Sequence, residues 1–278
     1  MPTYTTDDRV EIYYETMGRG ERIVLTHGSW TDSGTWVAIR EPLTERFEVV
    51  VWDRRGHSRS QDGTSPGTHR RDAADLAGLI EHLGHAPAHV VGNSAGGAIV
   101  LALVATRPEL VITAAVHEPG FSWLLDDTGD EALEQAALDE RRALETVREL
   151  LEAGSYRSAA ESFVDLAIGP GGWNQLPEET QNVLVSNAST FLDEIDEAYE
   201  KDSVDWSGIR AADVPLLATF GTESSPTLQE STRALARLLR SVQIEAIEGT
   251  GHIPHRTHPE RYLMALERFV DRSCAPAG

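Results

Sequence analysis

The sequence has little cysteine: its only one, Cys274, lies four residues from the C-terminus. One cysteine cannot form a disulfide within the chain, so cysteine usage gives no support for export to an oxidising compartment. The first residues lack the basic and apolar regions of a signal peptide. No uninterrupted apolar run approaches the ~18 residues that cross a bilayer. These absences predict a cytoplasmic protein without a membrane partner.

Basic residues are also scarce, because 24 Lys and Arg face 45 Asp and Glu, for a net charge of −21. Such a field repels polyphosphates and anionic lipid, so we expect no nucleic-acid partner. Residues 121–206 hold 21 of the acidic residues and only five basic ones. We interpret this acidic stretch as a solvated surface; a role in selecting the substrate is the alternative.

The remaining composition, with 40% apolar and 25% charged residues, is that of a globular protein. Short apolar segments predict strands at residues 10–16, 23–26, 49–52, 90–91, 111–116, 216–220 and 242–247. Amphipathic segments predict helices at residues 33–45, 69–83, 95–106, 226–240 and 258–272. This alternation indicates an α/β fold with a mostly parallel central sheet and flanking helices. The first two strands have no helix between them, so we expect them to pair as an antiparallel hairpin.

Residues 121–209 break this alternation, because their apolar spacing is helical and no convincing strand appears. A helical insertion between two strands is best placed over the carboxyl edge of the sheet, where ligands bind in open α/β folds. We therefore predict a core domain of residues 1–119 and 210–278 and a helical cap of residues 120–209.

The strongest chemical signal is the G-x-S-x-G motif at residues 92–96, which lies between a predicted strand and a predicted helix. Small residues on both sides allow a sharp turn that lifts the hydroxyl of Ser94 above the sheet. A serine hydroxyl needs a base to take its proton. His252 follows the strand at 242–247 after a glycine-containing loop, which puts it at the same sheet edge as Ser94.

Other histidines fit this role less well. His255 and His258 share the loop of His252, but no cluster of cysteines or carboxylates with metal-ligand spacing accompanies them. We therefore expect neither a metal nor a cofactor, and we interpret His57 as a loop anchor.

A second set of residues is predicted to hold a developing negative charge. Gly28 and Ser29 end a predicted strand, and Ala95 begins the helix after Ser94. Backbone N–H groups at these three positions are candidates for an oxyanion hole.

Taken together, these residues resemble the α/β-hydrolase fold superfamily. The resemblance covers essentially the whole chain, through His27-Gly28, the Asp-Arg-Arg-Gly-His-Ser run at 53–58, the turn at Ser94 and Gly251-His252. It implies a mostly parallel sheet with a helical cap inserted after the sixth strand. The superfamily includes esterases, lactonases, carbon–carbon bond hydrolases, peroxidases and members without enzymatic activity.

The acid of the implied catalytic triad departs from the commonest family pattern. Members most often carry an Asp three positions after a Gly in the loop after the cap, and here that position is Ser224. Glu223 is one candidate acid. Glu118, in the His-Glu-Pro run at 117–119, is the candidate that we favour, because some members take their acid from this earlier strand. The same run resembles the corresponding segment of zearalenone lactonases.

The resemblance implies a serine hydrolase that cleaves a small-molecule ester or lactone through an acyl-enzyme, with Ser94, His252 and Glu118 as its triad. The alternatives are carbon–carbon bond hydrolysis or a biosynthetic rearrangement on the same triad, or a receptor without turnover. Oligomeric state is open, a homodimer included. Four aromatic residues are candidates for substrate binding: Trp30, Phe121, Trp123 and Trp173.

Overall fold

The computed structural model describes residues 2–64, 67–84, 87–197, 201, 203–239 and 242–274. Its centre is one eight-stranded sheet in the order β1-β2-β4-β3-β5-β6-β7-β8. The strands from β3 to β8 run parallel to one another. Strand β2 pairs antiparallel with β4, and β1 pairs antiparallel with β2. This confirms the predicted α/β class. The strands are β1 (Thr3–Thr5), β2 (Glu11–Gly18), β3 (Glu21–Thr26), β4 (Phe47–Trp52), β5 (Ala88–Asn93), β6 (Val111–His117), β7 (Leu216–Gly221) and β8 (Val242–Ile247).

The expected hairpin between residues 10–16 and 23–26 is wrong. Strand β4 lies between β2 and β3, pairing antiparallel with β2 and parallel with β3. In β4, Val49, Val50 and Val51 are completely buried. A strand buried on both faces is poorly suited to a sheet edge, where its backbone groups would lack partners. The more polar β2 takes the outer position, and the short β1, which the sequence did not predict, pairs with it.

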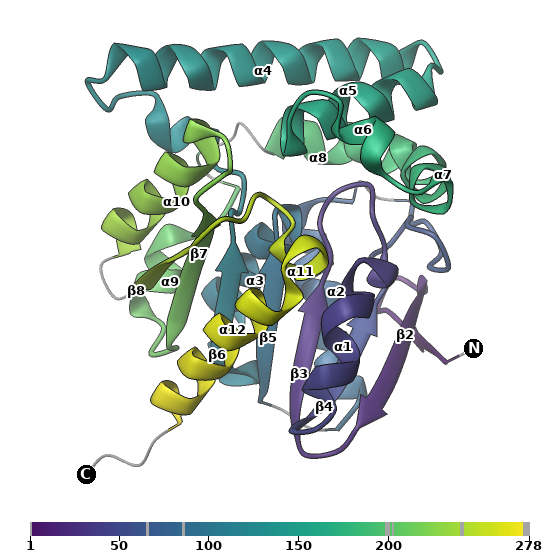
Figure 1. Cartoon of the computed structure of the whole chain (residues 1–278). Helices are drawn as coiled ribbons and strands as arrows, with labels where there is room; N and C mark the ends of the chain where they lie inside the picture. Colours follow the sequence, from purple (N-terminus) through teal and green to yellow (C-terminus); the bar gives the residue numbers. More distant parts are fainter. Residues whose placement is uncertain are drawn as a thin grey trace.

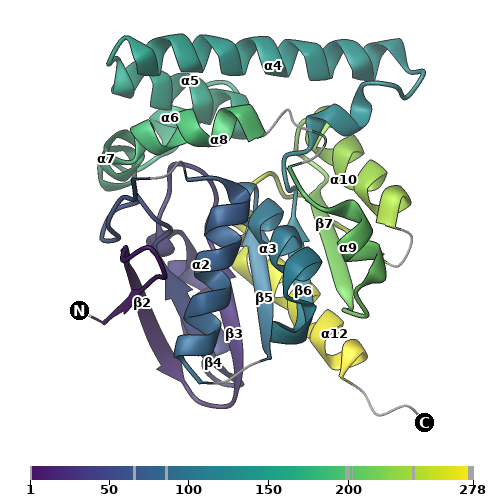
Figure 2. The ribbon, with the colours of Figure 1, turned by 180° about the vertical axis from the view of Figure 1, so that it is seen from behind.

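Helices cover both faces of the sheet (Figures 1 and 2). One face packs against α2 (His69–His82), α3 (Ala95–Thr106), α9 (Trp206–Ala211) and α10 (Pro226–Leu239), and the other against α1 (Val37–Leu43) and α12 (Pro259–Ser273). Successive side chains of a strand point to opposite faces. In β4, accordingly, Val50 joins the core under α2 and α3, whereas Val49 and Val51 join the core under α1 and α12.

The segment between β6 and β7 is helical, as predicted, and lies across the carboxyl edge of the sheet (Figure 1). These inserted helices are α4 (Glu131–Glu152), α5 (Tyr156–Ile168), α6 (Gly172–Gln175), α7 (Glu178–Ser186) and α8 (Phe191–Glu197). The side chain of Asp130 caps α4 by accepting hydrogen bonds from the N–H groups of Ala132 and Leu133. A separate core that includes Leu144, Val164 and Leu184 holds the inserted helices together.

The end of the insertion is less sharply defined than its start. Helix α9, whose first residues were expected in the cap, packs against α3, and its Ile209 belongs to the core of the sheet. Residues 198–200 and 202 of the expected cap, and residues 240, 241 and 275–278 of the expected core, lie outside the described residues. The boundaries at 119/120 and 209/210 therefore stay a prediction. Within the described ranges, no helix has the length and apolar character to cross a membrane.

Several histidines are buried in the core as neutral rings. Burial lowers the pKa of His57 to about 3 and the pKa values of His69 and His117 to about 4, from an ordinary value of 6.5. Below pH 6.5 the unfolded chain therefore binds protons that the folded chain does not bind until about pH 4. This difference removes stability as the pH falls through that window.

We expect the urea midpoint of unfolding to fall continuously between pH 7 and pH 5, because each such histidine removes up to about 1.4 kcal/mol per pH unit. The measurement is urea unfolding followed by circular dichroism. The experiment is done at high salt, which screens the repulsion caused by the net charge of −21. Without this screening the repulsion would also change over the same pH range. A constant midpoint would contradict the prediction.

Candidate active site

Ser94 lies in a sharp turn between β5 and α3. Its φ of 55° is in the region that L-residues rarely adopt. Two glycines make this turn possible: a Cβ atom at Gly92 would overlap the carbonyl oxygen of Gly96, and a Cβ atom at Gly96 would overlap that of Thr26. The backbone N–H of Ser94 donates to the carbonyl of His117 at 2.9 Å, which ties the turn to β6.

Glu118 and His252 meet beside this turn. The Nδ1–H of His252 donates to Oε2 of Glu118 at 2.7 Å, and both side chains are buried. The other carboxylate oxygen of Glu118 accepts a hydrogen bond from the backbone N–H of Gly221 at 2.8 Å. Glu118 directly follows β6 and also has a positive φ, of 44°. Both carboxylate oxygens are thus fixed, and the Nε2 atom of His252 is left to act on other groups.

The surroundings of Glu118 favour its ionised form. Burial alone would raise the pKa of this carboxyl group, but His117 and the hydrogen bond from His252 lower the pKa to about 2. Glu118 therefore carries a negative charge throughout the neutral pH range, as a group that stabilises a protonated imidazole must.

The loop after β7 places Glu223, the other candidate acid, at the surface. The side chain of Glu223 is exposed, and its backbone N–H donates to the carbonyl of Thr250. Ser224, at the position where family members most often carry an Asp, has a hydroxyl group that contributes to the lowered pKa of Glu118. The structure thus brings Glu118 to His252, and leaves Glu223 at the surface.

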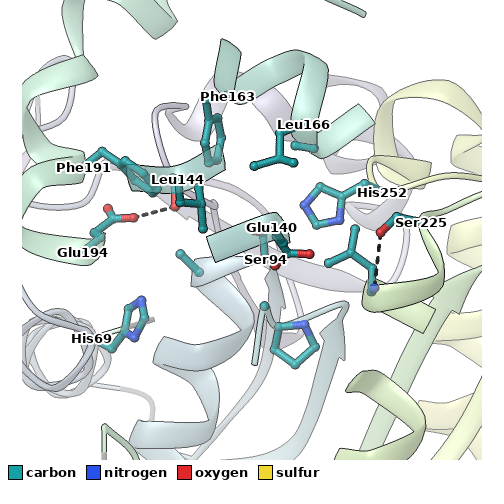
Figure 3. A pocket seen from close by; sticks show the side chains of 16 residues that line it. His69, Ser94, Glu140, Leu144, Phe163, Leu166, Phe191, Glu194, Ser225 and His252 are labelled. Atoms are coloured by element: carbon teal, nitrogen blue, oxygen red, sulfur yellow. Dashed lines mark hydrogen bonds between the residues drawn. The ribbon is translucent and has the colours of Figure 1, made fainter. Parts of the chain in front are cut away.

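Two cavities meet at Ser94 and His252, with volumes of about 100 and 70 Å³. Both are lined by Ser29, Ser94, Phe163, Ala167 and His252. The first cavity also contacts Ala95, Glu140, Leu144, Leu166, Phe191, Glu194 and Leu228 (Figure 3). The second extends toward Thr31, Thr35, Ile168, Leu176, Leu184 and Arg256. The inserted helices therefore form the roof over Ser94, with Phe163 and Leu166 of α5 above the site (Figure 3).

The three residues predicted for an oxyanion hole border these cavities. Ala95 lines the first, Gly28 the second and Ser29 both. Ala95 is the first residue of α3, and the first N–H groups of a helix have no partner within it. Gly28 packs closely on the turn, because a Cβ atom there would lie 3.2 Å from the Cβ of Ser94.

A buried ionic network joins this site to the inserted helices. Glu194 of α8 accepts a hydrogen bond from the hydroxyl of Ser29 at 2.5 Å and forms an ion pair with Arg54 at 2.6 Å. Arg54 also pairs with Asp72 of α2 at 2.7 Å, and the three charged side chains are almost inaccessible. The ring of His27 accepts a hydrogen bond from the N–H of Arg54 and contacts the carbonyl of Gly28. The network thus fixes the loop that carries Gly28 and Ser29.

The four aromatic residues expected to bind substrate do not line either cavity. Trp30 stacks on Phe163 and, with Trp173, belongs to the core of the inserted helices. Phe121 and Trp123 pack against Trp206 and the core beside the sheet. Large aromatic side chains contribute most to stability when they are buried, so these residues pack within the hydrophobic cores instead of facing the cavities.

His255 and His258, which follow His252 in the chain, contact different partners. His255 is buried, and its Nε2 lies 2.9 Å from the hydroxyl of Thr35, whereas His258 contacts Thr257. In the part of the chain that the structure describes, no group of three or more His, Cys, Asp or Glu side chains is arranged to hold a metal ion. His57 contacts Thr190 and the carbonyl of Arg55, as expected of a loop anchor.

Three charged residues of the cavities were missed in the sequence: Glu140, Glu194 and Arg256. For Glu194 a signal existed, because it falls on the same helical face as Phe191 and Ile195, which are buried. A charged residue on an apolar face indicates a buried partner. Glu140 carried the same signal, because it lies on the helical face of Ala137 and Leu144, which are buried. Arg256 carries no such signal, because it does not interrupt an apolar pattern.

Known proteins resemble this chain in sequence and in fold. A model of the alpha/beta hydrolase family matches residues 23–265. The chain belongs to this family. It is 28% identical to a non-heme haloperoxidase of Rhodococcus erythropolis, over 91% of this chain and 93% of that protein. It is 26% identical to a pimeloyl-[acyl-carrier protein] methyl ester esterase of Chromobacterium violaceum, over 94% and 99% of the two chains.

The fold of this family member also matches solved structures. A thermophilic esterase from Thermogutta terrifontis superimposes with a TM-score of 0.77 at 23% identity, covering 99% of each chain. At this identity the match shows the shared fold, and the related sequences support a hydrolase.

The buried network around Glu194 is testable by its effect on stability. We expect Glu194→Gln to lower the free energy of unfolding by about 3 kcal/mol, because it removes one partner of a buried ion pair. The neighbouring Asp193→Asn is the matched control: Asp193 is exposed, and the amide oxygen of Asn can still accept the hydrogen bond that the N–H of Gly67 donates, so its change stays within about 0.5 kcal/mol. Urea unfolding of both variants gives the comparison, and equal losses would contradict the role of the network.

Proposed function

We propose that this protein is a serine hydrolase that cleaves a small carboxylic ester or lactone through an acyl-enzyme. The observation that carries the proposal is the 2.7 Å hydrogen bond from His252 to Glu118, which is buried and ionised. His252 and Ser94 line the same cavity. A base oriented by a carboxylate, next to a hydroxyl held in a strained turn, is the arrangement that activates a serine.

In the proposed mechanism Ser94 Oγ attacks the substrate carbonyl while Nε2 of His252 takes its proton. Glu118 stabilises the imidazolium, and the backbone N–H groups of Ala95 and Ser29 or Gly28 bind the oxyanion. His252 then protonates the leaving alcohol, which departs as the acyl-enzyme forms. A water molecule, activated by His252, attacks the acyl-enzyme and releases the acid and Ser94. With a lactone the alcohol stays attached and the ring opens.

The cavity sizes favour a small substrate. Volumes of about 100 and 70 Å³ compare with the roughly 150 Å³ of an engineered cavity that holds benzene. Since the two cavities meet at Ser94 and His252, one accommodates the acyl group and the other the alcohol. The part of each group that lies inside its cavity then contains only a few carbon atoms.

A fluorophosphonate probe tests the nucleophile directly. We expect a single covalent adduct on Ser94 by intact mass and peptide mapping, and no adduct in Ser94→Ala. The same variant should lower kcat for a short ester by roughly a million-fold, because nucleophile and base act as a unit. Turnover retained in Ser94→Ala would refute the proposal.

Two glutamate variants test the acid. We expect Glu118→Gln to lower kcat by roughly 10³- to 10⁴-fold, as replacing the triad carboxylate by an amide does in other serine hydrolases. Glu223→Gln is the control from the alternative loop and should change kcat less than about twofold, because its side chain is exposed. The reverse ranking would move the acid to the loop after β7.

A further inference from the structure

Arg256 is a half-buried cation without a carboxylate partner. It lies in α11 (Pro254–Thr257), directly after the loop of His252. Its Nη2 atom donates to the hydroxyl of Thr180 in α7 at 3.2 Å. Among the described residues no carboxylate lies within 4.0 Å of its guanidinium, whereas Arg40 and Arg59 of the same surface both pair with Glu15. The free guanidinium is notable in a chain with a net charge of −21.

Arg256 also occupies a defined place relative to Ser94. It lines the second cavity together with Ser94 and His252, at the end that α7 covers. It lines as well an outer cavity of about 400 Å³, which contains Thr31, Thr35 and Leu184 of the second cavity and opens between the inserted helices and the core. A substrate group that extends from Ser94 through the second cavity therefore reaches the guanidinium.

The first cavity has the opposite character. Glu140 and Glu194 both line it (Figure 3). Glu140 accepts a hydrogen bond from Thr227, and Glu194 is held by Arg54. Carboxyl groups at these positions disfavour an anionic group in the first cavity. The charge distribution therefore orients a substrate with one anionic end, placing that end in the second cavity.

A guanidinium is suited to a particular ligand group. It remains charged at every physiological pH, and its parallel N–H groups match the two oxygens of a carboxylate. Burial lowers the pKa of Arg256, and Asp32 offsets this effect only in part. An unpaired guanidinium in partly desolvated surroundings gains stability when an anion binds it.

We propose that Arg256 binds a carboxylate of the substrate, so that the enzyme acts on short esters or lactones that carry a second, ionised carboxyl group. This inference rests on the proposed function, because it names the substrate class of the same site. Arg256 is then a specificity-determining residue that holds the far end of the substrate while Ser94 and His252 act on the ester.

The experiment compares matched pairs of esters that differ only in this charge. Monomethyl glutarate and methyl 5-methylhexanoate place the difference on the acyl side, and 3-acetoxypropanoate and 3-methylbutyl acetate place it on the alcohol side. The readout is the ratio of kcat/KM for the anionic ester to that for its neutral partner. This ratio cancels effects of a substitution on the catalytic groups themselves.

We expect a ratio above one for at least one pair in the wild type, and a 10- to 100-fold lower ratio in Arg256→Gln, the range of a charged hydrogen-bonded contact. Arg256→Lys should give an intermediate ratio, because it keeps the charge but loses the paired donors. Arg40→Gln is the matched control: it removes a cation of the outer cavity that does not line the second one. Its ratio should stay within about twofold of the wild type.

The outcomes separate the inference from the proposed function. If the neutral esters are hydrolysed in a Ser94-dependent way but Arg256→Gln leaves the ratio unchanged, the inference is wrong and the proposed function stands. If no ester is hydrolysed, the proposed function is wrong. Calorimetric titration with glutarate and 3-hydroxypropanoate then decides the inference: binding to the wild type that Arg256→Gln weakens at least tenfold supports it, and the lack of such binding overturns it.

Discussion

The candidate site depends on how closely the backbone packs around Ser94. Gly92 and Gly96 have no room for a Cβ atom, and this closeness holds Ser94 at its positive φ. The same contact presses α3 against the end of β3, so the helix N-terminus and the Gly28 loop lie side by side. A strained residue persists only when its surroundings determine it completely. The proposed nucleophile and the proposed oxyanion donors are therefore fixed by one steric constraint.

In the proposed triad the carboxylate comes from the end of β6, whereas family members most often carry it in the loop after β7. Strands β6 and β7 are parallel neighbours, and their carboxyl ends meet at the loop of His252. An acid at either end can reach the imidazole. Here the carboxylate comes from β6, and β7 contributes the N–H of Gly221 that holds the carboxylate in place. In the proposed triad, β7 therefore supports the acid and β6 supplies it.

Local motifs made much of this predictable from sequence. Glycines at 92 and 96 between an apolar strand and a helix predict the turn at Ser94, and the parallel arrangement places His252 and Glu118 at the same edge. The hairpin prediction was wrong because strand order depends on which strand needs two neighbours, a property of the whole sheet. Arg256 was missed for a similar reason: what makes it informative is a cavity wall formed by distant segments. Trp30 and Trp173, which were expected to bind substrate, line neither cavity, because both side chains pack in the core of the inserted helices.

The position of Glu118 also determines how the contacts of the candidate site are distributed along the chain. Ser94 and Glu118 both belong to the unit β5-α3-β6, so contacts local in sequence set their relative placement. His252 lies 134 residues after Glu118, so the hydrogen bond between them closes this long segment. Loop-closure entropy therefore opposes the contact between Glu118 and His252 more than it opposes the local contacts, and the pairing of β8 with β7 helps to offset this cost. This contact is the part of the candidate site that depends on the folding of the whole chain.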